Sequence, residues 1–420
     1  MLTEGGFQHS LMTEELISLK HLFQQEFSRM VAVISRRFGL THIEAAEDIV
    51  SETFLQAAEN WGMKGIPPNP TAWLYAVAKQ KALEQFRRQK IFEKTVLPEL
   101  QSRADLEDVE MNFSEENIRD SQLQMMFAVC TPAIASEAQI ALALRILCGF
   151  GIDEIAEAFY TPKETINKRL LRAKEKLRAE QVPMELPPEE EINARLDTVL
   201  RIIYLLFNEG YYSKTQDQIL RKELCAEALR LGVMLTEYER TDLPKTNALV
   251  ALMCFHASRF QARQAGEEAL ILYDHQNDAL WDRELIRRGR HYLERSIRGD
   301  VVSSYHWEAR IGSWHCIKED TKEKWEDILT LYDRLLEVRY SPSIALSRIY
   351  AFYKVYGPHA ALRKAEALNL KDDHFYYVLL GELYRTLDPR KAKENFRKAL
   401  ALAGTQTEKQ GIQEKIESLP

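Results

Sequence analysis

Apolar side chains recur three and four positions apart along nearly the whole chain, which is the period of an amphipathic helix. Further stripes of the same period follow from residue 189 to the end, and sustained strand-type alternation is absent. The chain is therefore predicted to be all-α. Before residue 189 the pattern is clearest over residues 11–38, 41–61, 71–90 and 137–147, and in two short segments between 151 and 178.

Two short helices joined by a tight turn are predicted between Gly151 and Arg178. The second is expected to begin with Thr161 as a side-chain cap, Pro162 in the first turn and Glu164 completing a capping box. Its apolar stripe consists of Ile166, Leu170, Ala173 and Leu177. Its other face is basic and contains Lys163, Asn167, Lys168, Arg172, Lys174 and Arg178, with Arg169 and Lys176 beside it. This arrangement is typical of the recognition helix of a helix-turn-helix, which enters the major groove; a solvated amphipathic helix is the alternative.

The helix predicted over 41–61 is expected to start with a capping box of Thr41 and Glu44. Polar side chains line up on its outer face at Asp48, Glu52 and Gln56, although such a stripe is usually just a solvated face. A loop from Trp61 to Pro70 follows, because three prolines in four positions exclude regular helix.

The next helix, expected to be capped by Thr71, mixes aromatic and basic side chains. Rings can stack on unpaired bases while cations hold the backbone, as in proteins that bind single-stranded DNA. The alternative is a helix with core aromatics and ordinary surface lysines. The mixed side chains are Trp73, Tyr75, Lys79, Gln80, Lys81, Arg87, Arg88 and Lys90.

The second half of the chain is separated from these helices by two boundary segments. Residues 93–120 have weak periodicity and about three times more acids than bases, which predicts a flexible acidic linker with helix resuming near Gln122. Three prolines predict a second boundary at 181–188. Near the C-terminus two helical segments align at an offset of roughly 31 residues, pairing Gly357-Pro358 with Asp388-Pro389. That offset is close to the tetratricopeptide period of about 34 residues and predicts a stack of helix pairs.

Composition narrows the possible functions. A length of 420 residues predicts two or three domains, and without a leader or a long apolar run the chain is expected to be cytoplasmic, with no membrane partner. No zinc motif, glycine-rich phosphate loop or nucleophile set is present, so no catalytic residue, metal or cofactor is assigned and the protein is expected not to be an enzyme. The net charge of −7 leaves only local basic patches for DNA contact. Reduced core thiols are expected at Cys130, Cys148, Cys225, Cys254 and Cys316.

Three segments, in this order, resemble an extracytoplasmic-function (ECF) sigma factor of bacterial RNA polymerase, of the sigma-70 family. DIVSETFLQA resembles region 2.2, NPTAWLYAVAKQKALEQFRRQK resembles regions 2.3 and 2.4, and EIAEAFYTPKETINKRLLRAKEKL resembles region 4.2. The resemblance divides the chain into region 2 over 1–92, the acidic linker over 93–120, a region 4 helix-turn-helix over 121–180, a linker over 181–188 and a C-terminal helical domain over 189–420.

The resemblance also implies roles for individual residues. The β′ clamp helices of core RNA polymerase would be contacted by Asp48, Glu52 and Gln56, and the β flap is a further implied partner. The −35 promoter element would be read by Asn167, Lys168, Leu171 and Arg172, with Lys163, Thr165, Arg169 and Lys174 on phosphates. The −10 element would be captured and melted by Trp61, Lys64, Asn69, Trp73, Lys79, Gln80, Lys81, Arg87 and Arg88. Because Asn167 stands where many of these factors carry a basic residue, the preferred −35 sequence is expected to differ.

The C-terminal half resembles the sigma factors that carry a tetratricopeptide-like extension. The matching stretches are RLDTVLRIIYLLFNEGYY, LCAEALRLGVML, DRELI, LYDRLL and SPSIALSRIYAFYKVYGPHAAL. The extension is expected to regulate activity in cis, by contacting the sigma domains or a regulatory protein. Two other hypotheses are a stand-alone helix-turn-helix regulator with a helical-repeat sensor domain, and a scaffold built on the repeats. The acidic stripe and the aromatic-basic helix favour the sigma factor, since a simple repressor needs neither.

Overall fold

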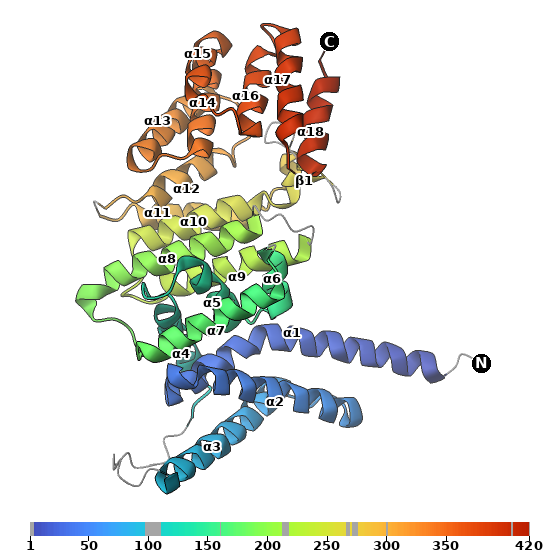
Figure 1. The fold of residues 1–420 in the computed structure, drawn as a ribbon, viewed down its shortest axis with the longest axis vertical. Helices are drawn as coiled ribbons and strands as arrows, with labels where there is room; N and C mark the ends of the chain where they lie inside the picture. Colours follow the sequence, from blue (N-terminus) through green and yellow to red (C-terminus); the bar gives the residue numbers. More distant parts are fainter. Residues whose placement is uncertain are drawn as a thin grey trace. The chain divides into compact units, whose positions relative to one another are not determined.

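The computed structural model of the chain describes residues 4–96, 111–159, 161–211, 218–265, 269–270, 276–299, 301–404 and 406–419. Figure 1 shows that these residues are almost wholly helical, which confirms the all-α prediction. The chain forms two compact units, Met1–Thr241 and Asp242–Pro420. Across the described ranges, no helix is both long and apolar enough to cross a membrane.

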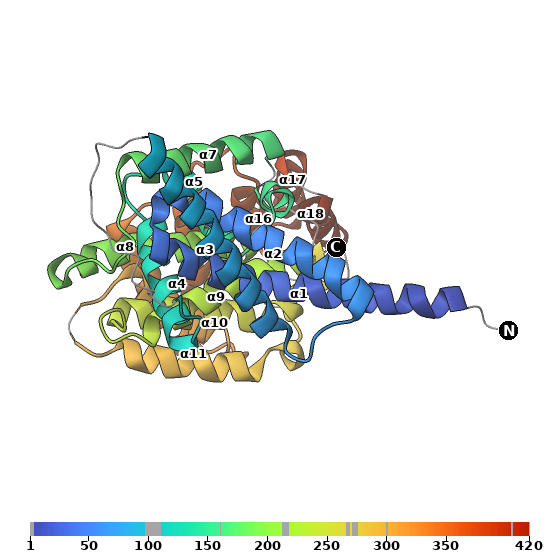
Figure 2. The same cartoon turned by 90° about the horizontal axis from the view of Figure 1, so that it is seen from below.

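The first unit is built around α1, which packs against α2, α3, α4 and α5. Figure 2 shows α3 running beside α1 and α2. The helices of this unit are α1 Glu4–Phe38, α2 Ile43–Lys64, α3 Pro70–Val96, α4 Glu115–Val129, α5 Ser136–Leu147, α6 Ile152–Ala158, α7 Lys163–Ala179, α8 Glu189–Tyr211 and α9 Gln218–Thr236, with a 3-10 turn, η1, at Leu40–His42.

Helix α2 buries one face, as its pattern predicts. The side chains expected to face inward are buried, namely Ala46, Ile49, Val50, Thr53, Phe54 and Ala57. The start of α2 differs from the prediction, because η1 precedes it and His42 takes the cap position without a side-chain hydrogen bond. Glu44 is directed to another helix, where it pairs with Arg178 (2.6 Å), so the capping box with Thr41 is not formed.

The acidic segment is partly helical, which corrects the predicted linker over 93–120. Helix α3 continues to Val96, and α4 begins at Glu115 rather than near Gln122. Ser114 caps α4 by accepting a hydrogen bond from the Asn117 amide (3.4 Å). Carboxylates in the first turn of a helix interact favourably with its dipole, so acids that suggested a linker stabilise a helix start here. Residues 97–110 lie outside the described residues.

Helices α6 and α7 are the two short helices predicted from the sequence. The predicted apolar stripe of α7 is buried and packs against α5. The predicted cap of α7 is wrong, because Pro162 takes the cap position and the Thr161 hydroxyl donates to the Phe159 carbonyl oxygen (3.0 Å). Tyr160 lies outside the described residues. A side-chain cap is found on α6, where the Glu154 carboxylate accepts a hydrogen bond from the Gly151 amide (2.7 Å).

Helices α8 and α9 pack against α4, α5 and α6 within the first unit. Arg195 of α8 donates to the Phe127 carbonyl oxygen (2.8 Å), and Arg230 of α9 donates to the Leu147 carbonyl oxygen (2.9 Å). The sequence suggested a boundary at 181–188, whereas the compact units divide after Thr241. The first helix pair of the predicted extension therefore shares a compact unit with the predicted region 4.

The second unit consists mainly of consecutive helices, and its described residues include two two-residue strands that pair in antiparallel fashion. Its elements are α10 Pro244–Ser258, η2 Gln261–Arg263, β1 Gln264–Ala265, β2 Ala269–Leu270, η4 Asp278–Leu280, α11 Arg283–Ser296, α12 Ser304–Trp314, α13 Lys322–Val338, α14 Pro342–Tyr356, α15 Pro358–Leu368, α16 His374–Tyr384, α17 Pro389–Leu402 and α18 Gln406–Glu417.

The repeat seen in the sequence corresponds to two helix pairs, α14 with α15 and α16 with α17. Pro358 and Pro389 occupy the same place in the two pairs, at the first position of the second helix. Helices α16 and α17 approach closely at Gly381, where an added Cβ would lie 2.5 Å from the Phe396 ring. Small residues at such contacts are expected where helix pairs stack.

All five cysteines are buried and form no disulfide, as predicted. Burial raises the pKa of the Cys130 and Cys254 thiols to about 12. Both thiols are therefore protonated and unreactive at neutral pH.

Candidate nucleic-acid interface

Helix α7 presents the predicted base-reading residues to solvent. Asn167, Lys168, Leu171 and Arg172 are all exposed, and even the apolar Leu171 exposes 51% of its surface. Asn167 and Lys168 lie in the N-terminal half of the helix, which is the half that a recognition helix offers to base edges, and Leu171 and Arg172 lie at its middle. Within the described ranges, neither Lys168 nor Arg172 has an ion-pair partner.

The predicted phosphate contacts of α7 are already positioned by carboxylates. Lys163 pairs with Asp153 of α6 (2.8 Å), and Arg169 pairs with Glu137 of α5 (3.0 Å). Thr165 is half-buried at the start of the helix. These pairs fix the direction of the cationic side chains, and because their carboxylates are exposed, phosphate can replace them at little cost.

The C-terminal half of α7 meets α2 through buried charges. Glu47 of α2 is only 5% exposed, and its carboxylate accepts from Lys174 of α7 and from Arg145 of α5, the latter at 2.8 Å. One turn away on α2, Glu44 pairs with Arg178 (2.6 Å). We call these five residues the clasp. Lys174, predicted to bind a phosphate, is thus held by a carboxylate in this arrangement.

The outer face of α2 combines acids with exposed apolar side chains. Asp48 and Glu52 are exposed and Gln56 is half-buried, in line as predicted. Leu55 and Met63 lie on the same face and expose 62% and 77% of their surfaces. The sequence reasoning missed these two residues, although they follow Asp48 at helical spacings of seven and fifteen. Two exposed apolar side chains therefore stand beside the acidic stripe.

Asp48 lies at the edge of this face, next to the clasp. Partial burial and the neighbouring Glu47 carboxylate raise the pKa of Asp48, while the Lys174 ammonium opposes the shift. The outer face of α2 and the C-terminal half of α7 are therefore electrostatically connected.

Trp61 is not at the surface, which corrects its predicted contact with the −10 element. It is only 5% exposed and packs edge-on against Trp73 of α3, with ring centroids 5.5 Å apart. It continues the buried stripe of α2 four residues after Ala57, so its burial follows from the same period that predicts the helix. In this structure Trp61 supports Trp73, which is half-buried.

The other residues predicted for the −10 element lie on α3 and in the turn before it. Asn69 caps α3, in place of the predicted Thr71, by accepting a hydrogen bond from the Ala72 amide (3.0 Å). Lys81 pairs with Glu52 (3.3 Å) and so connects α3 to the outer face of α2. Exposed side chains are Lys64, Asn69, Gln80, Arg87 and Arg88, and half-buried ones are Lys79 and Lys81.

Tyr75, predicted as part of the aromatic-basic surface, contributes to packing. Its hydroxyl donates to Glu26 of α1, and its ring stacks on Phe113 with centroids 4.7 Å apart. Burial and the Glu26 carboxylate raise the pKa of Tyr75 well above its ordinary value. Arg29 pairs with Glu26 (3.2 Å) and with Glu115, so α1, α3 and the start of α4 are held together by one polar cluster.

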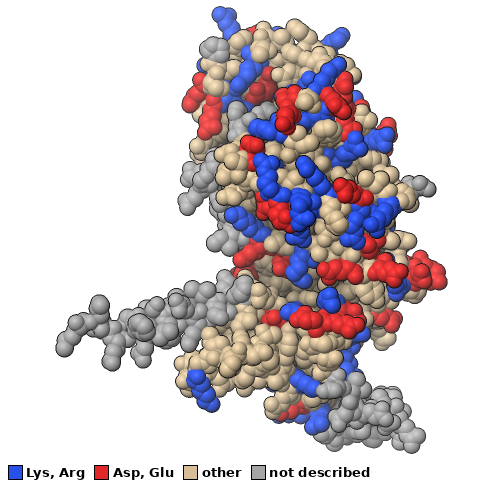
Figure 3. Space-filling view, turned by 180° about the vertical axis from the view of Figure 1, so that it is seen from behind, with Lys and Arg blue, Asp and Glu red and all other residues tan. Residues whose placement is uncertain are grey.

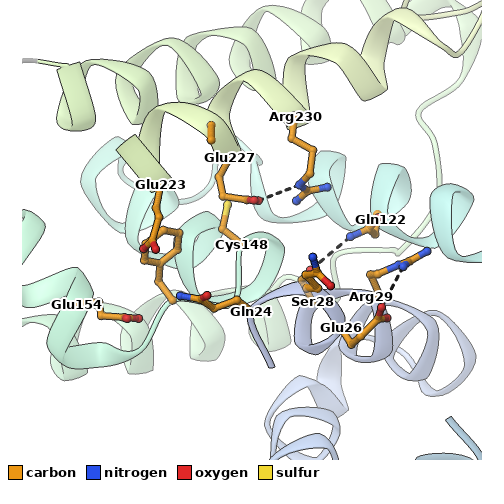
Figure 4. A pocket seen from close by; sticks show the side chains of 14 residues that line it. Gln24, Glu26, Ser28, Arg29, Gln122, Cys148, Glu154, Glu223, Glu227 and Arg230 are labelled. Carbon is orange, nitrogen blue, oxygen red and sulfur yellow. Dashed lines mark hydrogen bonds and ion pairs between the residues drawn. The ribbon is translucent and has the colours of Figure 1, made fainter. Parts of the chain in front are cut away.

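A pocket of about 640 Å³ opens between α1, α4, the turn before α6, and α9. Figure 4 shows its side chains turned toward one another: Glu26 meets Arg29, Gln122 meets Ser28, and Glu227 meets Arg230. These pairs satisfy the polar groups in the way expected where packed helices meet, so we assign no cofactor to the pocket. In the part of the chain that the structure describes, no group of three His, Cys, Asp or Glu residues is placed to hold a metal ion.

On the face drawn in Figure 3, Lys and Arg side chains are interspersed with Asp and Glu and do not form one broad basic area. Together with the net charge of −7, this favours a local nucleic-acid contact, such as the short exposed segment of α7.

Comparison with known proteins gives three findings. Residues 22–91 match the family model of Sigma-70 region 2, and residues 195–297 match a family of unknown function, DUF6596. The "Uncharacterized protein R00370" of Rhizobium meliloti (strain 1021) is 32% identical over 389 residues, which cover 90% of each chain. No solved structure matches the chain.

Proposed function

The chain belongs to one family with the Rhizobium protein and contains a sigma-70 region 2 domain, and we propose that it is a sigma factor acting in transcription initiation. It binds core RNA polymerase and promoter DNA, and the polymerase performs the catalysis. The observation that carries this function is the match over residues 22–91, which takes in about half of α1, all of α2 and most of α3. Membership of the ECF group and the tetratricopeptide character of the extension stay predictions.

The outer face of α2 is the proposed polymerase contact. It offers two exposed apolar side chains, Leu55 and Met63, beside the carboxylates of Asp48 and Glu52. Interfaces combine an apolar centre with a polar rim, and this face has both. A stand-alone regulator needs no such face, and this observation supports the sigma factor over that alternative.

The exposed half of α7 is the proposed reader of the −35 element. Arg172 and Lys168 can pair with guanine and Asn167 with adenine, provided that the helix enters the major groove. Helix α3 is the proposed −10 contact, in which Trp73, supported by Trp61, replaces stacking lost on melting. The side chains of Arg87 and Arg88 are exposed and could contact the phosphates of the separated DNA strand.

The extension is proposed to act in cis. Its first helix pair, α8 and α9, already packs on α4 and α5, through the arginine contacts to the carbonyl oxygens of Phe127 and Leu147. A truncation near Arg178 would remove that support and expose apolar surface. Tests of the promoter-binding part should therefore retain residues up to Thr241.

Transcription in vitro tests the function. Full-length protein, purified core polymerase and a promoter library should yield discrete start sites that are absent with core alone. If the protein binds duplex DNA but no transcripts are made, it is a stand-alone regulator instead. If it neither binds DNA nor supports transcription, the scaffold hypothesis remains.

Polymerase binding is tested separately with Met63→Asp. Because Met63 is 77% exposed, the substitution should leave the fold intact and weaken core binding by about tenfold or more, measured by co-purification and fluorescence anisotropy. Ile297→Asp is the matched control, since Ile297 is 72% exposed and lies in the second unit. Equal binding by both variants would remove the α2 face from the contact.

A further inference from the structure

Helix α11 carries a line of exposed arginines that has no role in the proposed function. Arg283, Arg287 and Arg290 are spaced by four and three residues, so they lie on one face of the helix, over about 10 Å of its length. All three are exposed, and the side chains of the first two expose 64% and 73% of their surfaces. Arg298 is exposed just after the helix ends. We call these four residues the arginine ridge.

The opposite face of α11 holds the helix in place. Ile286 and Gly289 are buried, and α11 packs along α10. A Cβ added at Gly289 would lie 2.7 Å from the Phe255 ring of α10, so the two helices are in close contact. Arg295 pairs with Asp242 at the beginning of the second unit (2.5 Å). The arginine ridge therefore projects from a firmly held helix, as a binding surface requires.

Folding does not account for the arginine ridge. Arg283, Arg287 and Arg290 are like charges three and four positions apart, and such pairs destabilise a helix. Arg283 also stands in the first turn, where the helix dipole disfavours a cation. Exposed pairs with Asp278 (3.5 Å) and Glu284 (2.6 Å) offset only part of this repulsion, and Arg290 has no ion-pair partner among the residues that the structure describes. Charges that cost stability are expected where an anionic partner binds.

The composition of this face favours phosphate over a protein surface. From Arg283 to Glu294 every exposed residue is charged except His291, whereas protein interfaces have an apolar centre. The lysine-free α11 has only arginine for a permanent cation, and the planar guanidinium matches phosphate with two parallel hydrogen bonds. The second unit has 28 Lys and Arg against 26 Asp and Glu, while the first has 28 against 37. The second unit therefore repels a polyanion less than the first.

We propose that the arginine ridge binds the phosphate backbone of duplex DNA without regard to sequence. The choice of duplex DNA among polyanions rests on the proposed sigma function, whereas the anionic character of the partner follows from the charges of α11. Three of the four arginines lie within residues 195–297, so this contact gives the part of the chain that matches DUF6596 a role in DNA binding. Phosphate contacts hold a protein on DNA without selecting bases, so the arginine ridge adds affinity and not selectivity.

The salt dependence of DNA binding measures the number of phosphate contacts. Full-length protein is titrated with a labelled duplex of mixed sequence, without polymerase, and binding is followed by fluorescence anisotropy. Each phosphate contact contributes about 0.9 to the slope of log affinity against log salt concentration, so the loss of three contacts lowers the slope by about 2.7. Between about 50 and 200 mM salt, the affinity of the native chain should therefore fall about 40-fold more than that of a variant with Arg287→Gln, Arg290→Gln and Arg298→Gln.

A matched variant removes the same charge elsewhere in the second unit. Arg363→Gln, Arg390→Gln and Arg397→Gln replace three exposed arginines of α15 and α17 and should change the slope by less than about 1. Equal slopes for the two triple variants overturn the inference. It is also overturned if the variant of the arginine ridge keeps its salt slope but binds core polymerase more weakly in the absence of DNA, because the ridge then contacts protein.

Glu294 allows a substitution that strengthens binding, a result that misfolding cannot imitate. It is exposed one turn after Arg290 on the same face, where its carboxylate repels phosphate. Glu294→Gln should raise the affinity for the mixed duplex about two- to fivefold at about 50 mM salt, whereas Glu394→Gln on α17 should raise it less than about twofold. If both substitutions raise the affinity equally, net charge alone controls binding and the inference fails.

The duplex measurements and the transcription assay can fail separately. Equal slopes for the two triple variants, together with normal transcripts from the native chain, overturn the role of the arginine ridge and leave the sigma function. The expected difference in slope, together with an absence of transcripts, overturns the sigma function and leaves the phosphate contact of α11.

Discussion

Glu47→Gln is the most direct probe of the buried charges between α2 and α7. The amide keeps the shape of the carboxylate but leaves Arg145 and Lys174 side by side without their shared anion. Removing one member of a fully buried ion pair costs about 3–5 kcal/mol. Here both cations retain some solvent access, at 17% and 13% of their side-chain surfaces, and Arg145 keeps the Phe150 carbonyl oxygen. We therefore expect the contact of α2 with α5 and α7 to lose about 2–3 kcal/mol.

Hydrogen exchange followed by mass spectrometry measures this loss where it occurs. A change of about 2–3 kcal/mol raises the opening equilibrium, and hence the exchange rate of amides protected by the contact, by about 30- to 150-fold. The effect should appear in peptides from α2, α5 and α7 and be absent from α14 to α17. Glu52→Gln on the same helix is the control: its carboxylate is 65% exposed, pairs with Lys81 at 3.3 Å, and should change exchange by less than about fivefold. If Glu47→Gln changes exchange no more than Glu52→Gln does, the buried charges do not stabilise the contact.

Three further predictions concern other parts of the chain. Arg172→Ala should weaken promoter binding by about 1–3 kcal/mol and remove discrimination at one −35 base, seen by competition with substituted duplexes; unchanged selectivity would exclude this side chain from readout. Gly381→Ala should destabilise the second unit by about 1–3 kcal/mol in urea unfolding, because its Cβ would meet the Phe396 ring at 2.5 Å, whereas Gly411→Ala, with open space around it, should be neutral or stabilising. The Cys130 thiol should resist modification by maleimide at pH 8 in the native protein, and rapid labelling would contradict its burial. Because burial raises the pKa of this thiol to about 12, its contribution to the free energy of unfolding should be full below pH 9 and should decline between about pH 9 and 12.

The helices could be predicted from the sequence because each depends on a local period. The stripe from Ile166 to Leu177 is buried as expected, and so is the inner face of α2. Helix starts were less predictable, since several short polar residues compete for each cap. Thr161 bonds to the preceding turn and Thr41 falls in a 3-10 turn, while Ser114 provides a cap that the acidic composition had hidden.

The site was only partly predictable, because its decisive contacts join residues far apart in the chain. The outward directions of Asp48, Glu52 and Arg172 follow from the helical period. The ion pairs of Glu47 do not follow from the helical period, because Arg145 is 98 and Lys174 is 127 positions away in the chain. Period alone shows that Glu47 lies on the inner side of α2, and a carboxylate there needs a cationic partner whose identity only the tertiary fold supplies.

The ion pairs of α7 bear on how the proposed reading helix would distinguish base edges from the DNA backbone, in a chain with a net charge of −7. Four cations of α7 have carboxylate partners on three other helices, namely Asp153 on α6, Glu137 on α5, and Glu44 and Glu47 on α2. Binding to phosphate therefore exchanges one anion for another, and little free energy is gained from charge alone. Arg172 and Lys168, which lack such partners in the described chain, gain fully from DNA. If α7 binds DNA as proposed, contacts at base edges are favoured over contacts to the DNA backbone, as the proposed promoter-selective function requires.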